Sequence, residues 1–443
     1  MPSKLDEIEI IKVKIMKLLV IGSGGREHAL AWRLTQNPNV QLVYVAPGNA
    51  GTAREDGMVN VNLTTIAQLL KFAQDEKIHL TVVGPEAPLA AGVVDTFQAA
   101  GLKIFGPTRR AAQLESSKDF AKQFMVRHNI PTSNYATFTS ATEARAYVMR
   151  EGAPIVIKAD GLAAGKGVVV ATTLEEAMAA IDTMFADSGG DANHRVVIEQ
   201  FMQGEEASFI CLCDGVHALP FASSQDHKRI FEGDLGPNTG GMGAYSPAQV
   251  VTPEVHARTM RDIIMPTLRG MAAEGAPFSG FLYAGLMIDL KGNPRVVEFN
   301  ARMGDPETQP IMMRLKSDFL TLIEHAIAGT VDKAEAEWDH RAALGVVMAA
   351  GGYPDAPIKG DEVSGLPANT ADAHIFHAGT VEQDDKIIVN GGRVLCVTAL
   401  GDTVRLAQQR AYQMLKSIRF NGMQFRRDIG HRAVDRGQTV GHE

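Results

Sequence analysis

Cysteine is scarce in this chain of 443 residues, which has only three. Cys211, Cys213 and Cys396 are too few for a disulfide framework and fit a reducing cytosol. No apolar run approaches the ~20 residues of a membrane span. Residues 1–15 also lack the apolar core and cleavage site of a secretory signal. These absences predict a cytoplasmic protein with no membrane partner.

A surplus of positive charge is missing too. Lys and Arg number 43 against 51 Asp and Glu, for a net charge of −8. Nucleic acid is therefore excluded as the main partner, because phosphate backbones recruit proteins through Lys and Arg. A local basic pocket for a small anion remains possible. The hydrophobic share of 45% is ordinary for globular proteins, and the length predicts several domains.

Glycine is the one residue in excess, with 43 copies against a usual share of roughly 7%. In the first third, apolar runs at 17–21, 41–46, 79–83 and 102–105 alternate with helical periodicity at 26–35, 65–75 and 89–100. This alternation predicts a Rossmann-like parallel sheet. Each predicted strand ends in a turn that contains Gly or Pro, at the edge where such sheets bind ligands.

The middle of the chain changes character. We expect antiparallel strands at 155–159, 167–172, 195–199 and 207–214, with a helix over 174–185. Residues 281–289 and 295–299 are expected to form a hairpin. A third unit starts near residue 341, with strands at 344–349, 386–389 and 393–399 and a helix over 403–417. The polar segment 426–443 is predicted to be a frayed tail.

The loop at 22–27, GSGGRE, follows a strand and opens a helix. This is the setting for a phosphate at a helix N-terminus. Glu27 stands where the dinucleotide fingerprint requires its third glycine, which argues against NAD binding. Arg26 would be unfavourable at a helix start unless an anion lay beside it. A plain tight turn is the alternative.

The segment 158–168, KADGLAAGKGV, is not a Walker A motif, because its glycines are too close and Gly167 replaces the Ser or Thr. It lies between two predicted strands and predicts a flexible hairpin that closes over phosphates. Lys158 would supply a point charge for them. A mobile surface loop would explain the glycines, but not a lysine on an apolar strand.

Two further segments carry candidate polar residues. In the turn at 199–206, main-chain groups of residues 200–202 could hydrogen-bond an adenine edge, and Glu206 could take ribose hydroxyls. Glu298 and Asn300 share one face of a strand by its period of two. Two such oxygen ligands suit Mg²⁺ or Mn²⁺. A solvated acidic turn and a solvated strand face are the respective alternatives.

One further glycine-dense loop, two cysteines and a histidine also stand out in the sequence. The glycine-dense loop at 233–243 follows QDHKR at 225–229 and is either a surface linker or a functional loop. Cys211 and Cys213 share a strand face and are expected to pack in the core. His28 is expected to pack beside its loop and not to act as a catalytic base.

In combination these motifs resemble the phosphoribosylamine–glycine ligase (glycinamide ribonucleotide synthetase) family of the ATP-grasp superfamily. The similarity covers residues 16–436 and rests, in order, on GSGGREHAL, APGNAGT, VVGPEAPL, GPTRRAAQLESSK, IKADGLAAGKGV, SSQDHKR, GPNTGGMGAYSP and EFNARMGDPETQ. ATP-grasp proteins often carry a further carboxylate on the preceding strand. That place falls near Gly285, which puts a third protein ligand for the metal in doubt.

The resemblance implies that ATP phosphorylates glycine and that the amine of 5-phosphoribosylamine attacks the glycyl phosphate. The catalytic candidates it implies are Arg302, Lys158, Asp226 and Asp305. The implied nucleotide-binding residues are Lys118, Lys158, Gly161, Gly165, Lys166, Gly167, Glu199, Gln200, Met202 and Glu206. The implied substrate-binding residues are Gly24, Gly25, Arg26, Asn49, Pro85, Glu86, Asp226 and Arg302. Glu298 and Asn300 would hold Mg²⁺ or Mn²⁺.

The expected architecture is multidomain α/β and α+β. It comprises a disordered leader at 1–15, a Rossmann-like substrate domain at 16–117, an ATP-grasp domain at 118–340 with a lid at about 136–207, a β-rich, barrel-like domain at 341–436 and a tail at 437–443. A monomer is expected. The alternatives are another ATP-grasp ligase or carboxylase, a catalytically silent nucleotide-binding module, and, much less favoured, an NAD-dependent oxidoreductase.

Overall fold

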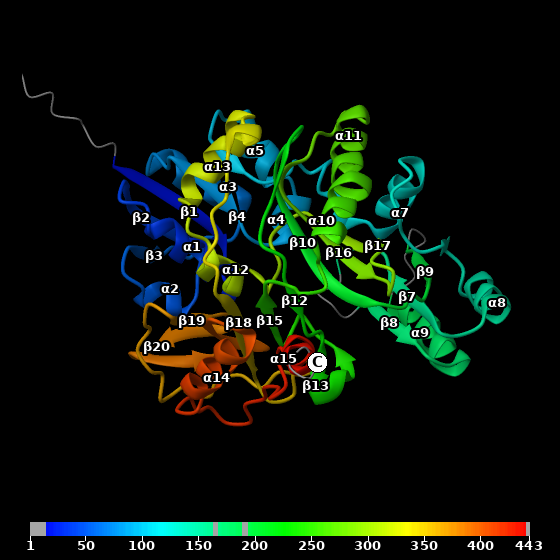
Figure 1. The fold of residues 1–443 in the computed structure, drawn as a ribbon. Helices are drawn as coiled ribbons and strands as arrows, with labels where there is room; N and C mark the ends of the chain where they lie inside the picture. Colours follow the sequence, from blue (N-terminus) through cyan, green and yellow to red (C-terminus); the bar gives the residue numbers. More distant parts are fainter. Residues whose placement is uncertain (1–14, 163–166, 188–193, 440–443) are drawn as a thin grey trace, which may run out of the picture.

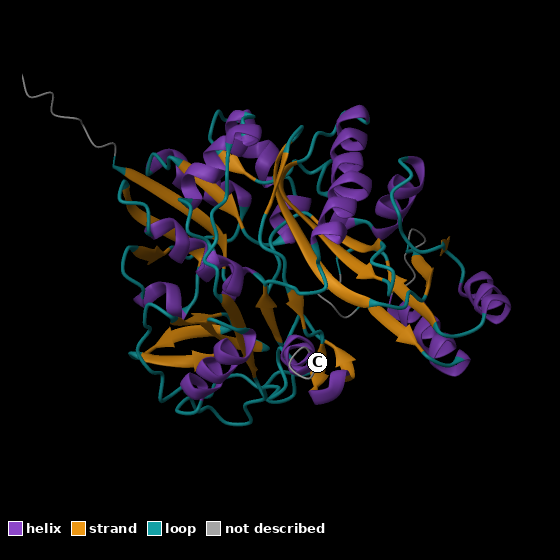
Figure 2. Cartoon of the chain, viewed as in Figure 1, coloured by secondary structure: helices purple, strands orange, loops and turns teal. Residues whose placement is uncertain are grey.

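The computed structural model describes residues 15–162, 167–187 and 194–439. Three lobes meet around a common centre (Figure 1). The N-terminal and C-terminal lobes lie on one side, and the middle of the chain extends away from them (Figures 1 and 2). Within the described residues, no helix has both the length and the apolar character that crossing a membrane requires.

The first lobe is the predicted parallel sheet, in the order β3-β2-β1-β4-β5, with β3 as an edge strand that was not predicted. Its elements are β1 (Met16–Gly22), α1 (Gly25–Thr35), β2 (Val40–Pro47), α2 (Ala50–Arg54), β3 (Met58–Asn60), α3 (Ile66–Asp75), β4 (Leu80–Val83), α4 (Glu86–Ala90), α5 (Val93–Ala99) and β5 (Ile104–Phe105). The helix predicted over 89–100 is two helices. Gly92 separates them because its φ of 90° is incompatible with a right-handed helix.

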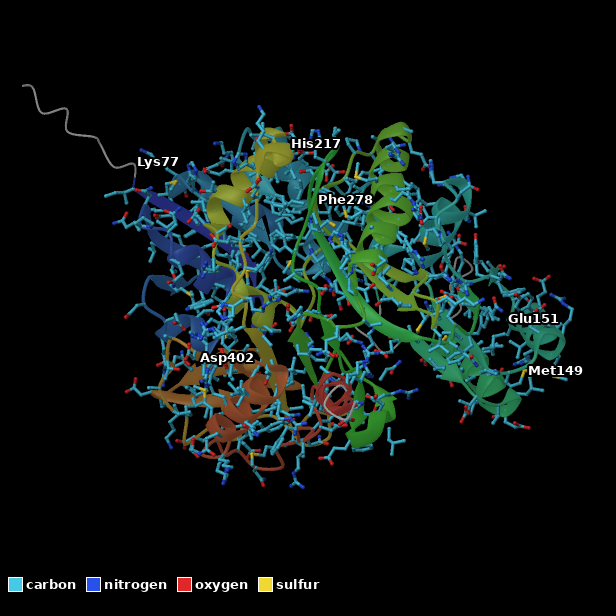
Figure 3. All side chains as sticks on the ribbon, viewed as in Figure 1. Lys77, Met149, Glu151, His217, Phe278 and Asp402 are labelled. Carbon is cyan, nitrogen blue, oxygen red and sulfur yellow. The ribbon has the colours of Figure 1, made fainter. Side chains whose placement is uncertain are left out.

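The segment predicted to be a lid, for which that name is kept below, is an antiparallel sheet in the order β6-β9-β7-β8. The chain reaches it through α6 (Gln113–Ser116) and α7 (Lys118–Arg127). The lid elements are β6 (Tyr135–Phe138), α8 (Ala141–Glu151), β7 (Ile155–Ala159), β8 (Val168–Ala171), α9 (Leu174–Asp187) and β9 (Val196–Gln200). Met149 and Glu151 on α8 mark the outer end of this lobe (Figure 3). The antiparallel strands expected here are confirmed.

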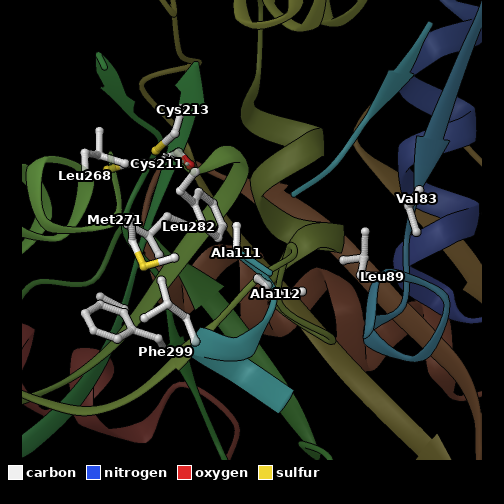
Figure 4. Packing of buried hydrophobic residues seen from close by; sticks show 14 of the residues in the cluster. Val83, Leu89, Ala111, Ala112, Cys211, Cys213, Leu268, Met271, Leu282 and Phe299 are labelled. Carbon is white, nitrogen blue, oxygen red and sulfur yellow. Dashed lines mark hydrogen bonds between the residues drawn. The ribbon is translucent and has the colours of Figure 1, made fainter. Parts of the chain in front are cut away.

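A second antiparallel sheet of the middle region has the order β11-β10-β16-β17. Its elements and covering helices are β10 (Glu205–Asp214), β11 (Ala218–Pro220), α10 (Pro253–Thr259), a π-helix (Met260–Ile264), α11 (Met265–Ala273), β16 (Ser279–Ile288) and β17 (Pro294–Asn300). The predicted hairpin is confirmed as β16 and β17. Cys211 and Cys213 on β10 are fully buried in the cluster that contains Leu268 and Met271 of α11 (Figure 4). Their predicted core role is therefore confirmed.

The C-terminal lobe is β-rich, as expected, but it recruits strands from the middle of the chain. Its sheet order is β12-β15-β18-β22-β19. The remaining elements are β12 (Gln225–Asp226), β13 (Arg229–Phe231), a 3₁₀ turn (Glu232–Asp234), β14 (Leu235–Asn238), β15 (Gly243–Ser246), α12 (Thr308–Arg314), α13 (Phe319–Ala328), a 3₁₀ turn (Val331–Lys333), β18 (Ala342–Ala349), β19 (Ala373–His377), β20 (Thr380–Gln383), β21 (Lys386–Val389), β22 (Arg393–Gly401), α14 (Val404–Leu415) and α15 (His431–Thr439). The segment between β12 and β15 forms the exposed hairpin of β13 and β14, and its end, at Thr239 and Met242, is buried.

The prediction of a frayed tail from residue 426 is wrong for residues 426–439. Arg426 is 1% exposed and pairs with Asp234 at 2.9 Å and Asp428 at 2.7 Å. Arg432 on α15 also pairs with Asp234, at 2.8 Å. Polarity suggested a solvated tail, but Asp234, which lies far away in the sequence, anchors both arginines. Residues 440–443 lie outside the described residues.

One hydrophobic core links the first lobe to the second sheet. Val83 and Leu89 of the first lobe, Ala111 and Ala112 beside α6, and Phe299 of β17 belong to a single cluster (Figure 4). Close packing of this kind resists relative movement. The ends of β1, β4 and β17 are therefore held in fixed relation to one another.

Candidate functional site

A cavity of about 570 Å³ lies between the lid sheet, β17 and the loops of the other two lobes. Of the predicted site residues, those that line it are Arg26, Glu86, Lys118, Lys158, Gly161, Gly167, Glu199, Gln200, Met202, Glu206, Asp226, Glu298, Asn300, Arg302 and Asp305. Gly24, Gly25, Asn49 and Pro85 lie at the edge of the first sheet and are not among the lining residues. Gly165 and Lys166 lie outside the described residues.

Two buried lysines share one buried carboxylate under the lid. The Nζ of Lys158 on β7 lies 2.7 Å from Oε1 of Glu199, and the Nζ of Lys122 lies 2.8 Å from Oε2. Burial lowers the pKa of Lys122 to about 8. Burial also acts to raise the pKa of Glu199, but the two lysines outweigh it and the pKa is lowered. The pair of cations thus keeps Glu199 ionised beside the cavity.

Lys118 holds the entrance of the lid loop. Its Nζ donates to the carbonyl of Gly161 at 2.7 Å, and its backbone N–H donates to the Asp160 carboxylate at 2.6 Å. Burial lowers the pKa of this lysine, although Glu298 opposes the shift. Lys118 and Lys158 therefore reach the same cavity from two different elements. Lys122 lies one turn after Lys118 on α7. No motif in the sequence marked it as a site residue, and it was not predicted.

Glu298 and Asn300 project from β17 as the period of two predicts. Gly285 on β16 is the register partner of Glu298, so the position opposite Glu298 supplies no third carboxylate. Burial acts to raise the pKa of Glu298, but neighbouring cations, Lys228 first, outweigh it and hold the pKa below its usual value. Asn300 donates its Nδ2 to Glu115 at 3.0 Å. One carboxylate and one amide carbonyl remain as hard oxygen donors.

The turn after β9 places Gln200, Met202 and Glu206 along the cavity wall. Met202 is 8% exposed, and the backbone N–H of Gln200 already donates to the carbonyl of Asn134 at 2.9 Å. Glu206 forms a close ion pair with Lys228, which also lies 3.8 Å from Glu298. Lys228 thus bridges two predicted site carboxylates. In the sequence, Lys228 stood out only as part of the QDHKR segment, and no role was predicted for it.

The glycine loop of the first lobe surrounds a side chain of the chain itself. A Cβ on Gly22, Gly24 or Gly84 would come within 2.4, 2.7 or 2.1 Å of the Glu27 side chain. Glu27 accepts the backbone N–H of Gly24 at 2.6 Å and pairs with Arg26 at 2.5 Å. The anions beside Arg26 in this structure are therefore Glu27 and, at 3.9 Å, Glu86. The predicted contact of Gly24, Gly25 and Arg26 with a substrate phosphate stays a prediction.

Asn49 and Pro85 are helix caps at this edge. The Asn49 Oδ1 accepts from the N–H groups of Gly51 and Thr52, and its Nδ2 donates to the carbonyls of Ser23 and His377. The amide is thus committed to bonds within the protein, and substrate contact by Asn49 also stays a prediction. Pro85 is the N-cap of α4, directly before Glu86.

Arg302 lies between two carboxylates that come from different elements. Its Nη2 is 2.8 Å from Glu115 on α6, and its Nε is 3.3 Å from Glu86 on α4. Asp305 pairs with Arg393 of the C-terminal lobe at 3.2 Å. Arg393 comes from β22, so the sequence offered no means of finding it. Glu115 lies in the quoted QLESSK motif but received no role.

Asp226 and Glu307 complete the polar wall. Burial raises the pKa of Asp226 to about 7. Glu307 accepts from Tyr283 at 2.9 Å and from Ser208 at 3.1 Å, both inside the protein. A buried carboxyl that titrates near neutrality, such as Asp226, can gain or lose a proton during a reaction. Glu307 was not predicted.

A separate polar group lies between the first and C-terminal lobes. Oε2 of Glu55 is 3.1 Å from Nε2 of His28 and 3.3 Å from Nε2 of His374, an arrangement of residue types that can hold a metal. However, Nδ1 of His28 accepts the backbone N–H of His377 at 2.9 Å. The proton of neutral His28 therefore sits on Nε2, where it blocks metal binding and donates to Glu55. His28 packs beside its loop, as expected.

Two antiparallel sheets that enclose a cavity with buried lysines and a Glu/Asn strand define the ATP-grasp class of enzymes. Family models of phosphoribosylglycinamide synthetase match the chain as an N domain at 16–115, an ATP-grasp domain at 116–308 and a C domain at 343–432. The chain belongs to the phosphoribosylglycinamide synthetase family.

Curated relatives agree with this assignment. The phosphoribosylamine–glycine ligases of Ralstonia nicotianae and Vibrio cholerae are 64% and 62% identical over 422 and 428 residues. These alignments cover 95% and 96% of this chain and 100% of each relative. The same enzyme from Thermotoga maritima, a solved structure, is 33% identical with a TM-score of 0.81, covering 94% of this chain and 100% of its own.

A more distant structure shows the fold alone. Biotin carboxylase from Campylobacter jejuni has a TM-score of 0.70 at 14% identity and covers 93% of both chains. The ATP-grasp architecture with its flanking lobes therefore persists where the sequence does not. The expected fold class is confirmed, and so is the family resemblance.

Proposed function

We propose that this chain joins glycine to 5-phosphoribosylamine at the expense of ATP, giving glycinamide ribonucleotide, ADP and phosphate in purine biosynthesis. The observation that carries the proposal is the convergence of Lys118, Lys158, Glu298 and Asn300 on one cavity. These residues come from α7, β7 and β17. The identity of the substrates is inferred from the family to which the chain belongs. The alternative is another carboxylate–amine ligase or a carboxylase on the same fold.

The lid side of the cavity would take ATP. Lys158 and Lys118 offer cations to its phosphates, and the turn from Glu199 to Glu206 offers Gln200 and Met202 to the adenine. Because Lys158 is already paired with Glu199 at 2.7 Å, it is held in place before the nucleotide arrives. Such preorganisation avoids a cost of ordering at the moment of reaction. Gly161, Gly165, Lys166 and Gly167 belong to the loop proposed to cover the phosphates.

Glu298 and Asn300 fit a divalent cation, proposed to be Mg²⁺ or Mn²⁺. Asn300 spends its NH₂ group on Glu115, which leaves the carbonyl oxygen for a cation. Glu298 is held ionised by the lysines around it. When bound, the cation would neutralise charge on the ATP phosphates.

The chemistry needs no protein nucleophile. A glycine carboxylate oxygen attacks the γ-phosphorus and ADP leaves, so glycyl phosphate forms. The amine nitrogen of phosphoribosylamine then attacks the carbonyl carbon and expels phosphate. Arg302 and Asp305 would orient the reactants, and Asp226, with a pKa of about 7, would accept the amine proton. The protein acts by positioning and by charge compensation.

The other lobes would take the second substrate. Arg26 and Glu86 line the cavity on the side of the first lobe, and the ribosyl phosphate and its hydroxyls are proposed to bind there. The proposed domain limits are 16–117, 118–340 with a lid at 136–207, and 341–436. A cytoplasmic monomer is likewise a proposal.

An ADP-release assay tests the function. We expect ADP to appear only when ATP, glycine and freshly generated phosphoribosylamine are all present. Bicarbonate in place of glycine should give no stimulation, which separates the ligase from a carboxylase. ADP release that is indifferent to glycine contradicts the proposal.

A further inference from the structure

Glu115 is a buried carboxylate that holds three consecutive residues at the end of β17. It lies on α6 and is 9% exposed. It accepts Nδ2 of Asn300 at 3.0 Å and the backbone N–H of Ala301 at 2.7 Å, and it pairs with Nη2 of Arg302 at 2.8 Å. Glu115 thus contacts a proposed cation ligand, the backbone beside it and a proposed catalytic arginine.

The bond to Asn300 fixes which way its amide faces. Burial raises the pKa of Glu115, and Arg302 opposes that shift. The backbone and guanidinium groups at this carboxyl are both donors, so its oxygens act as acceptors, and the group that Asn300 turns toward Glu115 is its NH₂. Oδ1 then has to point elsewhere. A cation binds that carbonyl oxygen and not the NH₂. The orientation of the cation ligand is therefore set by the chemistry of Glu115.

The contacts continue beyond Arg302. Nε of Arg302 lies 3.3 Å from Glu86 at the start of α4. A chain of polar contacts therefore runs from Glu86 through Arg302 and Glu115 to Asn300. α6 lies between the first lobe and the lid along the chain, and the two alanines just before it, at 111 and 112, share the common hydrophobic core. This packing gives Glu115 a fixed base from which to hold Asn300.

We infer that Glu115 is a positioning residue, which presents the Asn300 carbonyl to the divalent cation and holds Arg302 toward Glu86. The inference rests on the proposed function, because it takes Asn300 as a cation ligand. Residues that orient metal ligands typically affect metal affinity by about 10- to 100-fold.

The variant Glu115→Gln tests this role with little change in shape. With its Oε1 toward the N–H of Ala301, its NH₂ would take the place of Oε1 of Glu115. There it would meet both donors that contact this oxygen, the NH₂ of Asn300 and Nη2 of Arg302. Asn300 escapes this clash by turning its own NH₂ toward the cation. We expect the Mn²⁺ affinity of the protein with ADP, measured by electron paramagnetic resonance of free Mn²⁺, to fall about 10- to 100-fold. No turnover is needed for this measurement.

A paired variant supplies the rescue. In Glu115→Gln with Asn300→Asp, the new side-chain NH₂ at position 115 donates to one carboxylate oxygen at position 300, and the other oxygen is free for the cation. We expect Mn²⁺ affinity to return to within about threefold of wild type, well inside the loss expected for the single variant. Glu274→Gln is the matched control, since Glu274 pairs with Arg127 at 3.0 Å and neither residue lines the cavity.

The outcomes are separable. Weak Mn²⁺ binding in Glu115→Gln, restored by Asn300→Asp and unchanged in Glu274→Gln, supports the role. Wild-type Mn²⁺ affinity in Glu115→Gln overturns it. A loss that Asn300→Asp does not restore, with a lowered melting temperature, also overturns it in favour of a purely structural role. If the Mn²⁺ affinities of the wild type and the variants follow the supporting pattern, but the wild type shows no glycine-dependent ADP release, the proposed function fails and the positioning role stands.

Discussion

Two glycine-rich loops of this protein follow strands and face the same central region, yet they are built differently. In the first, Gly22 and Gly24, with Gly84 beside them, make room for Glu27. In the second, Gly161 opens the lid loop with a φ of +94°, and a Cβ there would meet no atom within 4 Å among the described residues. The first loop surrounds the carboxylate of Glu27. The second loop borders the cavity that Lys118 and Lys158 line.

The contrast teaches what a glycine motif in a sequence means. Glycine indicates that something approaches the backbone closely, but it does not say whether that is a ligand or a side chain. In the first loop the approaching group is the carboxylate of Glu27, bonded to Gly24 and paired with Arg26. Beside the second loop, Lys158 pairs with Glu199 and Lys118 donates to the carbonyl of Gly161, but no described side chain comes within 4 Å of a Cβ at Gly161.

The largest expected effect sharpens the ligand side of this comparison. Lys158→Met removes the cation that faces the cavity and leaves Glu199 with Lys122 alone. We expect kcat/KM for ATP in the ligase assay to fall about 10²- to 10³-fold, as for other groups that stabilise a transferring charge. Lys71→Met is the control, because Lys71 is an exposed lysine of α3 that pairs with Asp75. Equal losses in both variants would contradict the assignment of Lys158.

A glycine of the first loop should instead affect stability. In Gly84→Ala the new Cβ would lie 2.1 Å from Oε1 of Glu27. We expect the free energy of unfolding to fall by about 1–3 kcal/mol, the usual cost of overpacking, measured by urea denaturation. The double variant Gly84→Ala with Glu27→Ala should lose less than the sum of the single losses. Additive losses would show that Glu27 is not what the glycine accommodates.

The two loops also mark how far the sequence alone could predict the molecule. Periodicity predicted four of the five strands of the first sheet, three of the four strands of the lid and the β16–β17 hairpin, because those signals are local. It did not predict the short strands β3 and β6. It missed Arg393 and the pairing of β15 with β18, which depend on contacts between distant parts of the chain. It also treated Glu27 as a departure from a motif, because nothing in one sequence shows that a side chain folds back onto its own loop.

Acid should destabilise the contact between the first and C-terminal lobes, on the side of the molecule that holds the first loop. Burial lowers the pKa of His377 to about 3 and also lowers that of His28, so both resist protonation in the folded protein. In the unfolded chain these histidines take up protons below about pH 6.5. Unfolding therefore binds protons, and the stability present above that pH falls as the pH drops from about 6.5 toward 3.

A histidine variant measures this proton uptake. Between about pH 6.5 and 5, we expect His377→Asn to reduce the slope of unfolding free energy against pH by up to about 1.4 kcal/mol per pH unit, the equivalent of one proton. His340→Asn, with a side chain that is 90% exposed, should keep the wild-type slope. Parallel slopes for wild type and His377→Asn would mean that His377 does not bind its proton differently on folding.

The smallest effect separates the two loops most directly. Gly161→Ala adds a methyl group where space is open but φ is +94°, a conformation that disfavours L-residues by about 1–2 kcal/mol. This strain should lower the unfolding free energy, and because Gly161 borders the cavity, we also expect the KM for ATP to rise about 5- to 30-fold. Gly101→Ala is a matched control, with a φ of +73° and no atom within 4 Å of its Cβ, in a turn away from the cavity. Gly101→Ala imposes the same backbone strain at a position away from the nucleotide site. We therefore expect it to lower the unfolding free energy and to leave the KM for ATP unchanged. If Gly161→Ala behaves like Gly101→Ala, the lid glycine is a turn residue like those of the first lobe, and the difference between the two loops lies in the lysines alone.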